Sequence, residues 1–153
     1  MFKTISTSIF TPIILILLSL SLLVGGCNLI TGEDTCDTPH DSEQQIFDIT
    51  VQKAFDLIQE NTDNPDFIII DVRTPGEYAN GHIEYSLNID INSGDFVSQL
   101  EILDKDKTYL VYCRSGVRSA NARDTMAQLG FNNIYNMTSG ISEWQSAGFP
   151  VVR

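Results

Sequence analysis

The run Phe67-Ile68-Ile69-Ile70 constrains the fold of this chain more than any other stretch of its sequence. Every position is apolar, and the run ends at an acidic residue, Asp71. A strand with one solvated face alternates between polar and apolar residues, whereas a continuous apolar run is typical of a strand buried on both faces. Such strands belong to parallel sheets, so the sequence predicts an α/β fold with helices on both faces.

The remainder of the chain alternates between strand-like and helix-like segments. The other predicted strands are 47–49, 87–89, 108–112 and 133–136, and the predicted helices are 51–61, 96–103, 119–129 and 141–147. Thr50 is the expected N-cap of the first helix, and Gly130 is the expected glycine after the third. We therefore expect a central parallel sheet of about five strands.

The loop that begins at Cys113 is the strongest candidate for a reactive site. It follows the predicted strand 108–112 and leads into the predicted helix 119–129, so it places one thiol at the N-terminus of a helix. Successive backbone N–H groups and the helix dipole favour an anion at such a point. Arg114 and Arg118 add positive charge. Because each of these neighbours favours the charged form, we expect Cys113 to be a thiolate near neutral pH and to act as a nucleophile.

Composition limits the class of protein. The 153 residues suffice for one domain, and 20 Asp and Glu against 9 Lys and Arg give a net charge of −11. Without a basic run, nucleic acid is not an expected partner. The three cysteines, Cys27, Cys36 and Cys113, have neither the paired spacing of a zinc site nor the pattern of a disulfide framework. No metal or organic cofactor is predicted, and no glycine-rich nucleotide motif is present.

Residues 1–26 are predicted to lie outside the folded domain. They contain one basic residue and no acidic residue, and the stretch 13–24 is apolar except for two serines. Its length fits the apolar region of a secretory signal better than a membrane span. The segment ends in Val24-Gly25-Gly26-Cys27, which resembles a bacterial lipobox. This resemblance implies cleavage after Gly26 and lipid attachment to Cys27.

An uncleaved N-terminal anchor helix is the alternative, because residues 9–26 are just long enough to span a membrane. Both interpretations attach the chain to a membrane and place the domain on the extracytoplasmic side. Residues 27–45 are acidic and turn-rich, which predicts a flexible tether before a domain at 46–153. Cys36, within the tether, is either an ordinary exposed thiol or a resolving partner for Cys113.

Over residues 46–153 the chain resembles the rhodanese-like (thiosulfate sulfurtransferase) domain. Three separated motifs carry the resemblance and occur in the family's order. They are Asp71-Val72-Arg73-Thr74-Pro75-Gly76-Glu77-Tyr78 with Gly81-His82-Ile83, then Cys113-Arg114-Ser115-Gly116-Val117-Arg118-Ser119, and finally Gly140-Ile141-Ser142-Glu143-Trp144 with Ala147-Gly148-Phe149-Pro150-Val151.

The resemblance implies a sulfurtransferase in which Cys113 carries a persulfide. The thiolate would take sulfur from a small anionic donor such as thiosulfate and pass it to cyanide, a small thiol or a protein acceptor. The backbone N–H groups of Arg114, Ser115, Gly116, Val117 and Arg118 would bind the donor and the persulfide. No cofactor is implied, and a domain of this kind is expected to be monomeric.

Other residues of the motifs are expected to support the site. We interpret Asp71, Arg73 and Ser119 as structural supports of the loop, since ion pairs at the edge of a site often hold it in place. Arg118 is expected to stabilise the bound anion, to pair with a carboxylate near the strand ends, or both. Arg114 is expected to be exposed and to steer anions. His82 is interpreted as a structural hydrogen-bonding residue.

There are four alternatives to a thiosulfate sulfurtransferase. Phosphatases with a similar loop have five residues between cysteine and arginine, whereas here four separate Cys113 from Arg118. The shorter ring of N–H groups disfavours a phosphatase and, for the same reason, an arsenate reductase. A binding module that has lost catalysis usually lacks the cysteine. A sulfur-relay or redox role with a protein partner stays open beside thiosulfate chemistry.

Overall fold

The computed structural model describes residues 43–153, which form a five-stranded, all-parallel sheet. Residues 1–26, Cys27, Cys36 and most of the predicted tether lie outside this range. The strands are β1 (Gln45–Ile49), β2 (Phe67–Asp71), β3 (Leu87–Asn88), β4 (Thr108–Tyr112) and β5 (Asn133–Met137). Their order across the sheet is β1-β5-β4-β2-β3, so β4 lies at its centre. The predicted α/β fold is confirmed.

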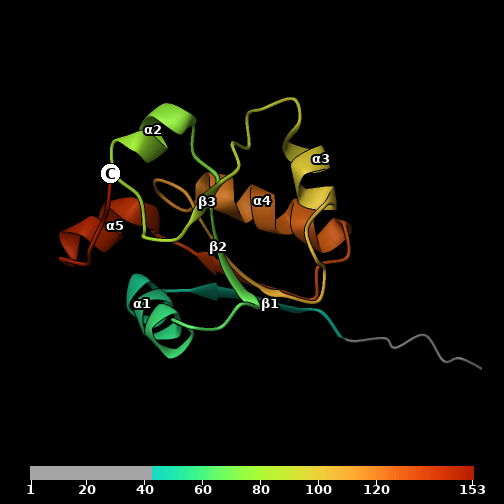
Figure 1. Cartoon of the computed structure of the whole chain (residues 1–153), viewed down its shortest axis with the longest axis horizontal. Coiled ribbons are helices and arrows are strands. Elements are labelled where there is room, and N and C mark those ends of the chain that lie inside the picture. The colour runs from blue at the N-terminus through green and yellow to red at the C-terminus, as the bar shows by residue number, and fades with distance from the viewer. Residues whose placement is uncertain (1–42) are drawn as a thin grey trace, which may run out of the picture. The chain divides into compact units, whose positions relative to one another are not determined.

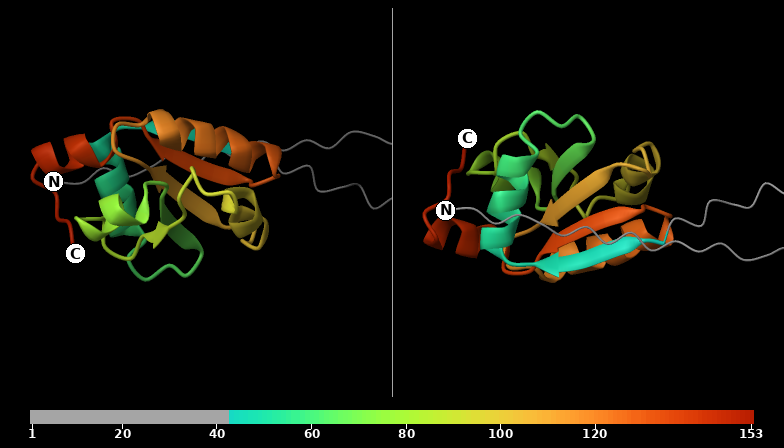
Figure 2. Two further views of the ribbon diagram at one scale, coloured as in Figure 1. Left: turned by 90° about the horizontal axis from the view of Figure 1, so that it is seen from above. Right: turned by 90° about the horizontal axis from the view of Figure 1, so that it is seen from below.

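Four helices connect these strands, a fifth follows the last strand, and together they cover both faces of the sheet (Figure 1). They are α1 (Val51–Glu60), α2 (Pro75–Ala79), α3 (Phe96–Glu101), α4 (Val117–Gln128) and α5 (Gly140–Ser146). The two opposite views in Figure 2 show α4 running along one face of the sheet, while α1 and α5 lie together at the other. Within residues 43–153 no helix has the length and apolar character that a membrane crossing requires.

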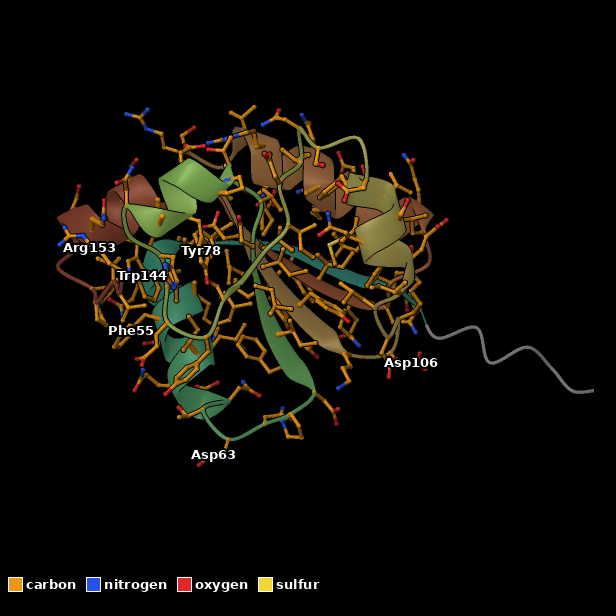
Figure 3. The ribbon with its side chains drawn as sticks, turned by 45° about the horizontal axis from the view of Figure 1, so that its top comes forward. Phe55, Asp63, Tyr78, Asp106, Trp144 and Arg153 are labelled. Carbon is orange, nitrogen blue, oxygen red and sulfur yellow. The ribbon has the colours of Figure 1, made fainter. Side chains whose placement is uncertain are left out.

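Each face of the sheet has its own apolar core. The core beneath α3 and α4 includes Leu100, Tyr109 and Met126, all fully buried. The core beneath α1 and α5 includes Ala54, Leu110 and Trp144. Phe55 and Trp144 lie side by side between these two helices, with ring centroids 5.8 Å apart (Figure 3). Burying a large apolar side chain contributes about 1.5–3 kcal/mol, so the two cores fix the position of β4 firmly.

The elements match the sequence prediction closely, with one helix added. Thr50 caps α1, its hydroxyl accepting from the backbone N–H of Lys53 at 3.3 Å. The helix α2 was not predicted, because it is only five residues long. Its local signal is a capping box in which Thr74 and Glu77 bond to each other's backbone N–H groups, with Pro75 at the first helical position.

The helix α4 begins at Val117, two residues before the predicted start at Ser119. Gly116 explains the difference, because its φ of 94° turns the chain directly from the loop into the helix. Its carbonyl accepts the N–H of Ala120 at 3.0 Å and so begins the helical hydrogen bonds. The N-terminus of α4 is thereby brought immediately next to Cys113.

Candidate active site

Cys113 follows β4, the central strand, and its side chain is almost completely buried at 1% exposure. It is a free thiol. Its Sγ accepts the backbone N–H of Gly116 at 3.1 Å. Burial alone would raise the pKa of the Cys113 thiol, but hydrogen bonds from the Ser119 hydroxyl and from backbone N–H groups outweigh it and lower that pKa. The site therefore stabilises the Cys113 thiolate more than water stabilises the thiolate of a free cysteine.

The N–H groups that lower the pKa of Cys113 belong to Ser115, Gly116 and Ser119. The sequence prediction placed this ring at residues 114–118. The structure adds Ser119, because the early start of α4 places the first turn of the helix over the sulfur. The hydroxyl of the fully buried Ser119 has one proton, which it donates to the Gly116 carbonyl at 3.0 Å or, after rotation, to the Cys113 sulfur. Ser119 therefore supports the loop and acts on the thiol itself.

Backbone hydrogen bonds from the start of α5 hold the active-site loop in place. The backbone N–H of Ile141 donates to the Cys113 carbonyl at 2.8 Å, and that of Ser142 donates to the Arg114 carbonyl at 3.1 Å. Gly140 makes this approach possible, because a Cβ at its position would lie 2.5 Å from the Cys113 carbonyl oxygen. The C-terminal motif noted in the sequence thus contributes backbone donors that fix the loop.

Asp71 and Arg73 form a buried ion pair at the end of β2, the strand beside β4. The Arg73 Nε donates to both carboxylate oxygens at 2.9 Å, and Nη2 also donates to the Gly81 carbonyl at 2.7 Å. The contact with Gly81 joins the end of β2 to the chain after α2. Neither side chain makes a hydrogen bond to Cys113, so the geometry agrees with a structural role.

Arg118 forms a two-point ion pair with Glu77 of α2. Its Nη1 and Nη2 each donate to one Glu77 carboxylate oxygen at 2.8 Å. The partner comes from the helix that was not predicted, rather than from a strand end. The hydrogen bonds from Arg118 lower the pKa of Glu77 to about 2. This pair joins α2 to the first turn of α4 and orients Arg118 beside the loop.

The Glu77→Gln variant is expected to lose about 1 kcal/mol of unfolding free energy near neutral pH, because an amide cannot form two charge-assisted bonds to Arg118. Since the pKa of Glu77 falls from 4.5 to about 2 on folding, the stabilisation is complete above pH 4.5 and is lost as the pH falls toward 2. Urea unfolding across this range should show the two proteins converging in acid.

The control for this experiment is Asp124→Asn, which removes a more exposed partner of Arg123 and should cost less than about 0.5 kcal/mol. A stability difference for Glu77→Gln that stays constant from neutral to acid pH would contradict the assigned role of the pair.

The positions of the other candidate residues fit supporting roles. Arg114, Ser115 and Val117 are exposed around the buried thiol. The ring of His82 stacks on Tyr78, and its Nδ1 lies 3.1 Å from the Tyr78 carbonyl. Among residues 43–153, no three His, Cys, Asp or Glu side chains gather as a metal site would require.

The model of the rhodanese-like domain matches residues 54–147, which include the whole site and most of the sheet. The chain belongs to the rhodanese-like domain family. A sulfurtransferase of Allochromatium vinosum is 33% identical over 96 residues, covering 63% of this chain and 88% of the relative. A tRNA uridine(34) hydroxylase of Photorhabdus laumondii is 34% identical over 104 residues, but the match spans only 29% of that protein.

A solved structure gives the same result. The crystal structure of a rhodanese-related protein from Thermoplasma volcanium superposes with a TM-score of 0.58 and is 36% identical. The match covers 69% of this chain and 96% of the other. The rhodanese-like domain thus occurs in this chain and in relatives named as sulfurtransferases. The larger hydroxylases also carry it.

Proposed function

We propose that this protein is a sulfurtransferase that carries a sulfane sulfur as a persulfide on Cys113. The buried thiol and its ring of N–H donors are the observation that carries the proposal. The lowered pKa of Cys113 supplies a nucleophile, and the donors that stabilise the thiolate are placed to stabilise a persulfide anion in turn. Relatives named as sulfurtransferases support the same reaction class.

The reaction consists of two displacements. The Cys113 thiolate attacks the outer sulfur of thiosulfate or a similar donor, a sulfur–sulfur bond forms, and the bond to the sulfonate group breaks so that sulfite leaves with the electron pair. A nucleophilic acceptor such as cyanide or a thiol then attacks the outer sulfur of the persulfide. The Cys113 thiolate leaves, and the resting enzyme is restored.

Arg114 and Arg118 have different roles in binding the anion. Arg114 is exposed and, among residues 43–153, has no salt-bridge partner, so its charge is available to attract the donor. Arg118 is held in place by Glu77, which also offsets part of its charge. We assign Arg114 to attraction of the anion and Arg118 to stabilisation of charge near the loop.

A sulfur relay to a protein partner is the second candidate, and the exposed mouth of the loop favours it. Val117 is 69% exposed beside the buried thiol, which gives a protein acceptor an apolar contact point. The four-residue spacing between Cys113 and Arg118 disfavours phosphatase and arsenate reductase activity.

Steady-state kinetics with thiosulfate and cyanide test the proposal. Sulfite and thiocyanate should appear in equal amounts, and double-reciprocal plots at several cyanide concentrations should be parallel, as a covalent intermediate requires. Intersecting lines would show that both substrates bind before sulfur moves, which contradicts a persulfide intermediate. Slow turnover with cyanide beside fast turnover with a protein acceptor would favour the relay.

We also propose that residues 1–26 are a signal sequence and that Cys27 carries a lipid that anchors the domain on the extracytoplasmic side of a membrane. The apolar stretch and the lipobox-like end of residues 24–27 support this. The proposed organisation is a signal at 1–26, a tether at 27–45 and the domain at 46–153, acting as a monomer.

The wild-type protein is expected to incorporate a labelled fatty acid during expression in bacteria, whereas Cys27→Ala should incorporate none, because the acceptor thiol is gone. Cys36→Ser is the matched control and should retain the label. An unlabelled wild-type protein whose mass includes residues 1–26 would show that the segment is an uncleaved anchor helix instead.

A further inference from the structure

A cavity of about 280 Å³ lies beside the exposed side of the active-site loop. Three segments of the chain form it: α2 with the residues on either side of it, the loop, and α5. We call it the Arg114 cavity, and its polar side chains are Arg73, Glu77, Asn80, Arg114, Ser142 and Gln145. Its volume is near the lower end of the roughly 300–1,000 Å³ that small-molecule sites occupy.

The charges around this cavity leave one cation without a partner. Arg73 is bound to Asp71, and Glu77 is bound to Arg118. Arg114 forms no salt bridge within residues 43–153. The chain has a net charge of −11, so most of its surface repels anions. An unpaired arginine in a cavity is therefore a favourable place for one small anionic group to bind.

The neighbours of Arg114 suit a carboxylate. The side chains of Asn80, Ser142 and Gln145 form no hydrogen bond with another described residue, so their amide and hydroxyl donors are free. A guanidinium group binds a carboxylate through two parallel N–H bonds, and amide and hydroxyl groups supply further donors. The backbone N–H of Ser142 donates to the Arg114 carbonyl at 3.1 Å, and this hydrogen bond holds α5 next to Arg114.

The position of the cavity indicates that it binds the sulfur acceptor rather than the sulfur donor thiosulfate. In thiosulfate the anionic group is bonded directly to the sulfur that Cys113 attacks, so it must lie at the ring of N–H groups. The Arg114 cavity is lined by Arg114 but by no other residue of the loop, and not by Cys113. An anion bound there is therefore separated from the reacting sulfur by several bonds.

From this geometry we infer that the Arg114 cavity binds the carboxylate of a small organic thiol, which is the sulfur acceptor. The inference rests on the proposed sulfurtransferase function. The acceptor thiolate attacks the outer sulfur of the Cys113 persulfide, and its new sulfur–sulfur bond forms as the bond to Sγ breaks. The products are the acceptor persulfide and the Cys113 thiolate, so atoms and charge balance without an oxidant or reductant.

The test compares a thiol that has a carboxylate with a thiol of the same carbon chain length that has a neutral alcohol in its place. Full-length protein is loaded with thiosulfate, and the discharge of its persulfide is timed with 3-mercaptopropionate and with 3-mercapto-1-propanol. Wild-type protein should prefer the carboxylate. Gln145→Glu places a negative charge in the cavity and should lower the ratio of the two rates about tenfold, or roughly 1.4 kcal/mol.

The matched control is Gln128→Glu, which adds the same charge at the last residue of α4, about 16 Å along the helix from its start. It should keep the wild-type ratio. An equal ratio in wild type and Gln145→Glu, with persulfide forming normally in both, overturns the inference and leaves the proposed function intact.

If no persulfide forms, a binding measurement still tests the carboxylate site separately from the proposed sulfurtransferase function. The thioether 3-(methylthio)propionate cannot accept sulfur, and it should shift the side-chain amide NMR signals of Asn80 and Gln145 in the wild-type protein. These shifts should be absent with the matching alcohol. Failure to load sulfur refutes the proposed function, whereas unshifted amide signals refute the carboxylate site.

Discussion

The Cys113→Ser variant is expected to lose sulfurtransferase activity by roughly 10³-fold or more while remaining folded. A hydroxyl in this position is a far weaker nucleophile than a thiolate, and its proton is not removed by the N–H donors that lower the pKa of Cys113. The fold should persist, because serine is slightly smaller than cysteine and can accept the Gly116 N–H that now binds Sγ. Activity with thiosulfate and cyanide, with circular dichroism for the fold, checks both parts.

Cys36→Ser is the matched control, since it makes the same substitution in the predicted tether. Turnover by this variant should equal that of the wild type. A large loss of activity in Cys36→Ser would give Cys36 a resolving role, and substantial activity in folded Cys113→Ser would refute the assigned nucleophile.

The Gly116→Ala variant is expected to lose at least about 3 kcal/mol of unfolding free energy, and its activity with it. Gly116 has a φ of 94°, and a Cβ at this position would lie 1.5 Å from the Thr138 carbonyl oxygen. The backbone fixes the position of a Cβ, and the oxygen belongs to the backbone, so rotation of a side chain cannot relieve the overlap. The loop must move away from β5, which would displace the N–H that binds the Cys113 sulfur.

Gly76→Ala provides the control for this prediction. Gly76 lies within α2, where a Cβ would meet no atom within 4 Å. Alanine should therefore stabilise the protein by about 0.5–1 kcal/mol, as expected for glycine replacement inside a helix. Chemical denaturation of both variants measures the difference, and a Gly116→Ala variant as stable as the wild type would contradict the close packing of the loop.

The strands β2 and β4 were predictable because most of their consecutive residues are apolar. β2 and β4 are apolar runs that end at Asp71 and just before Cys113, and the carboxyl ends of parallel strands meet at one edge of the sheet. Both side chains were therefore expected at the same edge. The reactive thiol could be identified from this placement together with the arginines that follow it.

The contacts that complete the site could not be predicted in the same way. Glu77 and Arg118 lie 41 positions apart, and no local pattern states that their helices meet. The approach of Gly140 to the Cys113 carbonyl depends on how α5 packs beneath the loop. The helix α2 was detectable through Thr74 and Glu77, whose capping box is a local signal.

The most direct test of the central claim is the mass of the Cys113 peptide after full-length protein is incubated with thiosulfate. The peptide should gain one sulfur atom, which cyanide should then remove, and the Cys113→Ser protein should gain none. A folded wild-type protein with a titratable Cys113 thiol that gains no sulfur would contradict the account.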